Sequence, residues 1–220
     1  MSSKKYNRTF HLPFSPGATS DDKIASDVSS ILNCPVVITE KMDGSNASLE
    51  YAGCFARSHG GPPNHPSFDG LKALHAKVKM EIPDNIQIFG EWCFAEHSIK
   101  YEELPGYFMI FNVRDSVQNT WESWDMVQLW AETIGCSTVP ILFQGVIKTE
   151  SELQSMADKI MKNKSACGGE REGFVIRVAD SFHDDSFANN VMKWVRSNHV
   201  TTDEHWKSKE IVRNKLKVIS

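Results

Sequence analysis

Five short stretches place charged side chains beside glycines or at the ends of apolar runs. They are Lys41-Met42-Asp43-Gly44, Arg57-Ser58-His59-Gly60, Phe89-Gly90-Glu91-Trp92, Glu172-Gly173-Phe174-Val175-Ile176-Arg177 and Lys193-Trp194-Val195-Arg196. A neutral lysine can act as a nucleophile, carboxylates can hold a metal ion, and clustered cations neutralise phosphate oxygens. Each stretch alone is a weak signal, because a Glu beside a Gly is more often a solvated strand end. Together they predict one shared cleft.

Lys41 is the candidate nucleophile within this set. It follows the β-branched run Val36-Val37-Ile38 and precedes Asp43-Gly44, so the sequence predicts a lysine where a buried strand meets a tight turn. A lysine in that place must be paired or neutralised. The alternative is a strand end whose lysine extends into water, which is the commoner case for an isolated Lys-x-Asp-Gly.

Hydrophobic periodicity predicts an α+β fold of mostly antiparallel sheets flanked by helices. The patterns indicate an irregular N-terminal arm over residues 1–19 and one domain over residues 1–200. Strands are expected at residues 36–40, 46–51, 54–58, 86–92, 107–113, 139–143, 173–178 and 190–196, and helices at residues 21–32, 67–80, 124–134 and 149–163. His75, on the apolar stripe of the second helix, is most simply a core histidine.

The last segment, residues 201–220, predicts a basic helix packed on the domain. Its cations Lys207, Lys209, Arg213, Lys215 and Lys217 could follow a phosphate backbone, and Lys209 and Arg213 are candidate contacts to nucleic acid. The same cations could equally form the solvated face of an amphipathic helix that buries Trp206, Val212 and Leu216.

Composition excludes several classes of protein. The chain has 220 residues and a net charge of −4, so any nucleic-acid site must be a local basic patch. Its five scattered cysteines, with no Cys-x-x-Cys pair, favour reduced thiols in the cytoplasm and argue against structural zinc. No apolar run is long enough to span a bilayer, and the start lacks the apolar core of a signal peptide.

In their order along the chain, these motifs resemble those of the covalent nucleotidyltransferases, which include polynucleotide ligases and capping enzymes. The closest likeness is to ATP-dependent RNA ligases of bacteriophage type. Glu40-Lys41-Met42-Asp43-Gly44-Ser45-Asn46 resembles their nucleophile motif, including the Ser-Asn after Asp-Gly. Arg57, Phe89-Gly90-Glu91, Phe108-Met109-Ile110-Phe111-Asn112, Glu172 to Arg177 and Lys193 match the later motifs in turn, so the resemblance runs over about residues 36–200.

The resemblance implies a nucleotidyltransferase domain and a role for each matching residue. Lys41 would carry AMP, Glu172 would hold Mg²⁺ or Mn²⁺ through water, Glu91 would accept hydrogen bonds from the ribose, and Phe111 would stack on adenine. Glu40 or the adjoining backbone would read the adenine edge, while Asp43 and Asn46 would orient Lys41 and the reacting ends. The implied substrates are ATP and RNA with 5′-phosphate and 3′-hydroxyl ends, which an end-healing kinase and phosphatase could supply.

The sequence departs from the family pattern at two places. The stacking motif usually has Asp after its phenylalanine, where this chain has Asn112. The last motif usually reads Lys-x-Lys, whereas here Val195 holds the second lysine's place and Arg196 follows it. Residues two apart on a strand share a face and residues three apart do not. Arg196 therefore needs a bulge or its own length to reach a phosphate, or Lys193 acts alone.

A lysine nucleophile must lose its proton before it can attack. A free lysine, with a pKa of about 10.4, is almost wholly protonated at neutral pH, and lowering that pKa by about three units costs roughly 4 kcal/mol. We expect burial, a metal ion and the neighbouring cations Lys193, Arg196 and Arg57 to supply this shift.

Three functions fit these observations. The first is an ATP-dependent RNA ligase that seals ends through lysyl–AMP and adenylated RNA. The second is a DNA ligase or a guanylyltransferase, which typically carry an oligonucleotide-binding-fold domain after the last motif, whereas only about two dozen residues follow Lys193 here. The third is a non-catalytic nucleotide- or RNA-binding module. A non-catalytic module would be expected to have lost charged residues of these motifs. All five are present here, namely Lys41, Arg57, Glu91, Glu172 and Lys193.

Overall fold

Two mainly antiparallel sheets form the framework of the protein. The structure, a computed structural model, describes residues 4–57, 61–197 and 211–218. Within these ranges a five-stranded sheet has the order β1-β12-β10-β2-β9, and a seven-stranded sheet has the order β11-β7-β6-β5-β3-β4 with β8 paired to β6. Only the pairs β1–β12 and β6–β8 are parallel among the described strands. The α+β fold predicted from the sequence is confirmed.

The elements have the following bounds. The strands are β1 (Phe10–His11), β2 (Pro35–Lys41), β3 (Ser45–Glu50), β4 (Gly53–Ala56), β5 (Ile86–Trp92), β6 (Phe108–Asp115), β7 (Thr120–Trp121), β8 (Ser137–Thr138), β9 (Ile141–Val146), β10 (Gly173–Val178), β11 (Phe182–His183) and β12 (Val191–Val195). The α-helices are α1 (Asp69–Val78), α2 (Trp124–Thr133), α3 (Glu150–Met161) and α4 (Phe187–Asn190), and short 3₁₀ turns lie at Ser29–Ile31, Pro66–Phe68, Lys79–Glu81 and Asp184–Ser186.

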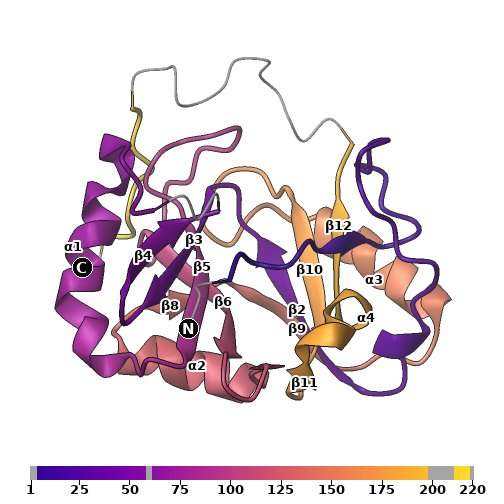
Figure 1. Cartoon of the computed structure of the whole chain (residues 1–220). Coiled ribbons are helices and arrows are strands. Elements are labelled where there is room, and N and C mark those ends of the chain that lie inside the picture. Colours follow the sequence, from indigo (N-terminus) through magenta and orange to yellow (C-terminus); the bar gives the residue numbers. More distant parts are fainter. Residues whose placement is uncertain (1–3, 58–60, 198–210, 219–220) are drawn as a thin grey trace.

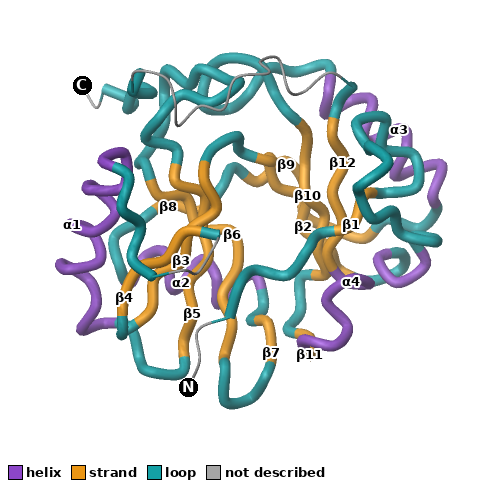
Figure 2. Tube along the Cα trace, turned by 45° about the horizontal axis from the view of Figure 1, so that its top comes forward, coloured by secondary structure: helices purple, strands orange, loops and turns teal. Residues whose placement is uncertain are grey.

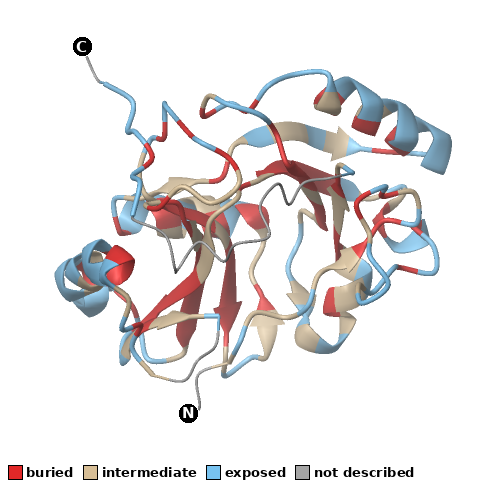
Figure 3. Ribbon diagram, turned by 90° about the horizontal axis from the view of Figure 1, so that it is seen from above, coloured by how far each residue is buried: buried red, intermediate tan, exposed pale blue. Residues whose placement is uncertain are grey.

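Helices cover the outer faces of both sheets, as Figure 1 shows. Helices α1 and α2 pack on the seven-stranded sheet, where Leu71 and Val127 join the larger apolar core. Helix α3 packs on the five-stranded sheet through Leu153, Ala157 and Ile160. The helices are therefore buried on one face and exposed on the other (Figure 3). Within the described residues, none of the helices has the length or apolar character that crossing a membrane requires.

Two helix caps follow the sequence signals. The Ser123 side chain accepts a hydrogen bond from the Met126 amide at the start of α2, and the Thr149 side chain accepts one from the Glu152 amide at the start of α3. These bonds satisfy backbone donors that have no partner inside the helix. On α1, His75 Nε2 lies 2.7 Å from the Glu50 carbonyl, which supports its structural interpretation.

The prediction of a helix over residues 21–32 is wrong. Its described residues form turns and one 3₁₀ turn, and Ile24, expected on the buried face, is half exposed. The Asp22 carboxylate instead accepts hydrogen bonds from the backbone and hydroxyl of Thr19, and Asp27 bonds in the same way to Ser29. Short polar side chains that bond to nearby backbone compete with helix formation, so the local turns replace the helix.

The expected C-terminal helix is also absent from the described residues 211–218. These residues are extended and form isolated bridges from Arg213 to Ala95 and from Leu216 to Leu104. Val212 and Leu216, expected to face inward, are exposed, and Asn214 is the buried residue instead. Trp206, Lys207 and Lys209 lie outside the described residues, so the boundary near residue 200 stays a prediction.

Candidate active site

Lys41 ends strand β2 beside the start of β10. The antiparallel register pairs Lys41 with Gly173, which places the preceding Glu172 next to the lysine. The Lys41 Nζ lies 2.7 Å from Glu172 Oε1 and 2.8 Å from Oε2. A Cβ on Gly173 would lie 2.0 Å from the Trp194 carbonyl oxygen, so only glycine allows β12 to approach this closely. The Glu172-Gly173 motif thus holds the carboxylate against Lys41 and brings β12 alongside.

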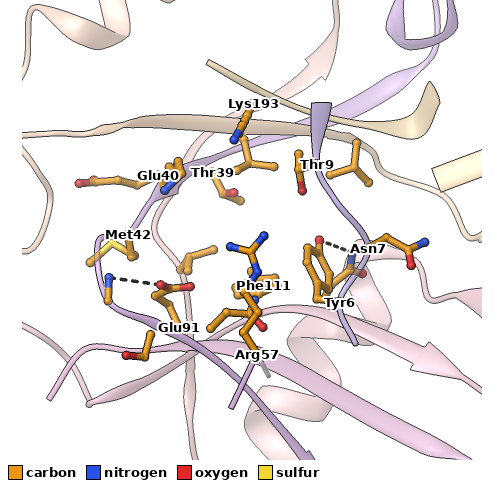
Figure 4. Close-up of a pocket in the computed structure, with 18 of the residues that line it drawn as sticks. Tyr6, Asn7, Thr9, Thr39, Glu40, Met42, Arg57, Glu91, Phe111 and Lys193 are labelled. Carbon is orange, nitrogen blue, oxygen red and sulfur yellow. Dashed lines mark hydrogen bonds between the residues drawn. The ribbon is translucent and has the colours of Figure 1, made fainter. Parts of the chain in front are cut away.

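The turn after Lys41 is held from two sides. The Asp43 Oδ2 accepts hydrogen bonds from the amides of Ser98 and Ile99, at 2.7 and 2.8 Å. The Gly44 amide donates to Glu91 Oε1 at 3.2 Å, a bond drawn in Figure 4. Asp43 was expected to orient Lys41 and the reacting ends, but its carboxylate is bound to the chain's own backbone. These bonds fix the turn, and the expected role of Asp43 towards Lys41 stays a prediction.

Carboxylates dominate the electrostatics around Lys41. Burial alone lowers the pKa of Lys41, but the negative charges of Glu172, Glu91 and Asp43 outweigh it, and the net pKa lies above the usual value. Desolvation, reinforced by Glu172, raises the pKa of Glu91 to about 8. The expectation that crowded cations hold Lys41 neutral is therefore wrong for this structure. Lys41 is charged and paired.

Lys193 faces the same region from β12. Burial lowers the pKa of Lys193, the charge of Asp22 opposes that shift, and the charge of Lys41 adds to it. The Lys193 Nζ lies 3.5 Å from Asp22 Oδ1. Lys41 and Lys193 are thus close enough to repel each other, and each has an acidic partner.

A cleft of about 890 Å³ opens between the two sheets. Figure 4 shows Thr39, Glu40 and Lys193 on one side of it and Arg57, Glu91 and Phe111 on the other. The residues that were predicted from the sequence and line the cleft are Glu40, Lys41, Asn46, Arg57, Glu91, Phe111 and Lys193. Glu172 is not one of the residues that line the cleft, but its carboxylate forms an ion pair with Lys41, which does line it.

Other predicted residues lie elsewhere. Arg196 does not line the cleft, and its guanidinium pairs with Glu170 at 2.7 Å. Because it is three residues from Lys193, it leaves the shared strand face as the alternation of side chains requires. Arg213 lies over the ring of Phe94, 5.6 Å from its centroid, also outside the cleft. Lys209 lies outside the described residues.

Glu40 is buried and only partly satisfied. Its Oε2 accepts hydrogen bonds from the Ala166 amide at 3.0 Å and from Arg171 Nη2 at 3.3 Å. Its Oε1 has no hydrogen-bond partner among the described residues. A buried carboxylate oxygen left in this way is costly unless a ligand donates to it. Glu40 can therefore bind a donor group placed in the cleft.

The N-terminal arm forms one wall of the cleft, which the sequence did not predict. Figure 2 shows the arm crossing from the seven-stranded sheet to β1. Tyr6, Asn7, Arg8 and Thr9 line the cleft. The ring centroid of Tyr6 lies 5.0 Å from that of Phe111 and 5.2 Å from that of Phe89. A hint in the sequence is Tyr6, the aromatic residue within the otherwise polar residues 2–9.

Asn112, a departure from the family pattern, connects the arm to a buried arginine. Its Oδ1 accepts a hydrogen bond from Arg177 Nη1 at 2.6 Å, and its Nδ2 donates to the Tyr6 hydroxyl at 3.2 Å. Burial lowers the pKa of Arg177 to about 10 and raises that of Tyr6 to about 12. The neutral side-chain amide of Asn112 therefore bonds to both Arg177 and Tyr6 without adding a charge to this buried region. Like Asp22 and His97, Asn112 and Arg177 line the cleft although no role was predicted for them.

A metal ion held by the described residues would need water or substrate as further ligands. Among the described residues, no group of three or more His, Cys, Asp or Glu side chains could hold a metal ion. Mg²⁺ and Mn²⁺ accept oxygen donors, and Mg²⁺ commonly keeps most of its waters and takes one or two carboxylates. Of the two nearby carboxylates, Glu91 lines the cleft, and Glu172 lies beside it with both oxygens bonded to Lys41.

Solved structures of known proteins identify the class of fold. An RNA ligase of Naegleria gruberi, an E227A mutant with ATP and Mn, matches with a TM-score of 0.52 and 16% identity over 79% of this chain and 53% of that one. An archaeal ATP-dependent RNA ligase matches with a TM-score of 0.53 and 16% identity over 78% and 45%. A putative ATP-dependent DNA ligase from Aquifex aeolicus matches with a TM-score of 0.50 and 21% identity over 75% and 44%. The fold is that of the polynucleotide ligases.

A sequence model of the family described as RNA ligase matches residues 34–195. The chain therefore belongs to the RNA ligase family. It spans about half the length of the solved ligases it resembles. A comparison with curated protein sequences found no significant match.

Proposed function

We propose that the protein is an ATP-dependent RNA ligase that joins 5′-phosphate and 3′-hydroxyl RNA ends through lysyl–AMP and adenylated RNA. The observation that carries this proposal is the Lys41 amine, bound by both oxygens of Glu172 at the wall of a cleft of about 890 Å³. Membership of the RNA ligase family supports RNA as the acceptor. Ends of the required chemistry would come from a kinase and a phosphatase acting on a broken strand.

The first step transfers AMP to the lysine. The neutral Lys41 Nζ attacks the α-phosphorus of ATP, a nitrogen–phosphorus bond forms, and pyrophosphate leaves with the electrons of the broken phosphorus–oxygen bond. The charged Lys41 amine first gives one proton to Glu172, its hydrogen-bonded partner at 2.8 Å, and the second proton, released once the nitrogen has bonded to phosphorus, passes to water. A 5′-phosphate oxygen of RNA then takes AMP from Lys41, and the 3′-hydroxyl displaces AMP to close the phosphodiester.

The charge of Lys41 is the main barrier to this step. The charge of Glu172 raises the pKa of the lysine, so the free protein stores the nucleophile in its protonated form. A divalent cation held by Glu172 would supply positive charge that lowers this pKa and neutralises the phosphates. The similar Naegleria gruberi ligase was solved with ATP and Mn, which supports ATP as substrate and a divalent metal as cofactor for this chain.

The cleft offers a partner for each part of ATP. The unpaired Oε1 of Glu40 can accept a hydrogen bond from the adenine amine, whereas the O6 of guanine would place an acceptor against it. Phe111 supplies an aromatic face, and Glu91 can accept from the ribose hydroxyls. Lys193 and Arg57 line the cleft with the positive charge that phosphates need. Asn46, the second residue of β3, is proposed to contact the RNA end.

The experiment is covalent labelling. The protein is incubated with a divalent metal and with ATP or GTP carrying an α-phosphate label, then denatured and separated by electrophoresis. We expect label retained from ATP and not from GTP, and we expect Lys41→Ala to abolish the label while its circular dichroism stays that of the wild type. A labelled Lys41→Ala protein would remove the nucleophile assignment.

A DNA ligase is the second candidate function, since the putative DNA ligase from Aquifex aeolicus shares the fold. Adding matched RNA and DNA strands with 5′-phosphates to the labelled protein separates the two. Transfer of AMP to RNA ends supports the proposal, and transfer to DNA ends alone would replace it with the DNA ligase.

A further inference from the structure

The segment Ile211–Val218 is bound along the loop of residues 93–104. Five backbone hydrogen bonds join them: Glu96 N to Val212 O at 2.8 Å, Asn214 N to Phe94 O at 3.0 Å, Lys215 N to Tyr101 O at 2.9 Å, Leu104 N to Lys215 O at 3.0 Å and Lys217 N to Leu104 O at 2.8 Å. The large apolar side chains of the segment, including Val212 and Leu216, are exposed. Directional polar contacts, and not apolar burial, therefore hold the segment in place.

Asn214 is the centre of this contact and is 2% exposed. Its Oδ1 accepts a hydrogen bond from the Tyr101 amide at 2.7 Å. Its Nδ2 donates to the carbonyls of Cys93 at 2.9 Å and Ala95 at 3.3 Å. A primary amide is required here, because one side chain must both accept and donate in a fixed geometry. Asn214 thus ties both halves of the loop together.

The other side of the same loop holds the turn that follows Lys41. The Ser98 and Ile99 amides donate to the Asp43 carboxylate, and the Asp43 amide donates to the Tyr101 hydroxyl at 2.9 Å. Tyr101 therefore forms hydrogen bonds with Asn214 through its backbone amide and with Asp43 through its hydroxyl. This chain of contacts ends two residues from the Lys41 amine.

We propose that Asn214 is a positioning residue that sets the nucleophile turn through Tyr101 and Asp43. The inference rests on the proposed function, because it takes Lys41 to be the group that attacks ATP. Asn214 touches no substrate. It fixes the backbone on which Lys41 is mounted, and a nucleophile displaced by a fraction of an ångström loses rate even when the nucleotide is still bound.

Three variants of the full chain test this inference. Asn214→Ala removes the side-chain contacts to the loop. Tyr101→Phe removes only the hydroxyl that accepts from Asp43, and it keeps the ring. Lys215→Ala is the matched control, because it lies next to Asn214, keeps its backbone hydrogen bonds and loses only an exposed side chain 3.6 Å from Glu102.

The first measurement is hydrogen–deuterium exchange, which needs no activity. In Asn214→Ala we expect exchange to speed up by about tenfold in peptides covering residues 93–104 and also in those covering residues 41–46. Peptides from α3 should be unchanged, which shows that the variant is folded, and Lys215→Ala should match the wild type. Faster exchange in the loop without any change at residues 41–46 would overturn the inference.

The second measurement is the single-turnover rate of AMP transfer to Lys41 as a function of ATP concentration. For Asn214→Ala and Tyr101→Phe we expect the saturating rate to fall by about tenfold or more, with half-saturation within about twofold of the wild type. The double variant should fall no further than the slower single variant, because both act along one chain of contacts. A change in half-saturation alone, or additive losses, would contradict the inference. A wild-type protein that forms no adduct would refute the proposed function instead, and the exchange result would still decide the coupling.

Discussion

At the residue scale, Lys41 and Glu91 are close enough that the charge of each shifts the pKa of the other. Glu91 accepts from the Gly44 amide and faces the charges of Lys41 and Glu172. Its pKa of about 8 means that the folded protein holds a proton there which the unfolded chain releases near pH 4.5. Folding stability must therefore fall as pH rises from about 4.5 to 8 because of this residue.

Glu91→Gln should remove that loss of stability. Glutamine keeps an oxygen for the Gly44 amide and carries no charge, so it resembles protonated glutamate. We expect the thermal midpoint of the variant to equal that of the wild type near pH 5 and to exceed it by about 2–6 °C at pH 8.5. Scanning calorimetry across this range is the measurement. A constant difference at every pH would show that Glu91 does not titrate as described.

Asn112 is a second residue whose chemistry can be isolated. Asn112→Leu leaves the buried Arg177 guanidinium without its 2.6 Å acceptor, and we expect a loss of about 2–4 kcal/mol in unfolding free energy. Asn112→Asp keeps an acceptor for Arg177 and can take a hydrogen bond from Tyr6, so it should cost under about 1 kcal/mol. Urea unfolding at neutral pH compares the two. Equal losses would mean that shape, and not the hydrogen bond to Arg177, matters at this position.

At the element scale, the positions of β10 and β12 decide whether Glu172 and Lys193 can serve one cleft. The two strands pair in antiparallel register, with Val175 opposite Lys193. At their end, Gly173 lies against the Trp194 carbonyl with no room for a Cβ. The glycine of the Glu172-Gly173 motif is thus a packing requirement between strands.

Gly173→Ala should push these strands apart. We expect a loss of about 1–3 kcal/mol in stability and a larger loss of AMP transfer to Lys41 than the stability change alone would cause, because Glu172 moves with the strand. Gly106→Ala is the matched control, since a Cβ there meets no atom within 4 Å. Guanidinium unfolding and the labelling assay give the two values. Full AMP transfer in Gly173→Ala would show that the strand spacing is adjustable.

At the scale of the whole molecule, the sequence predicted the parts of the site that local patterns encode. The bounds of β5 and β10 agree with the apolar runs that predicted them, and Lys41, Arg57, Glu91 and Lys193 converge as their positions at strand ends suggested. Local pattern could not show that Tyr6 enters an aromatic cluster, because that contact joins residues more than 80 positions apart. Nor could it show that both oxygens of Glu172 bind the Lys41 amine, since the register that brings the two residues together exists only in the folded sheet.

The cleft draws its walls from both sheets, so nucleotide binding should stabilise the molecule as one unit. We expect ATP to raise the thermal midpoint by an amount that grows with the logarithm of its concentration above the Kd. Lys193→Ala, on the five-stranded sheet, and Arg57→Ala, beside the seven-stranded sheet, should each reduce that shift, because each removes a cation that faces the cleft. Lys148→Ala, on an exposed segment outside the cleft, is the control. If only one of the two cleft variants reduced the shift, the nucleotide would bind to one sheet, and the cleft as a whole would not be its site.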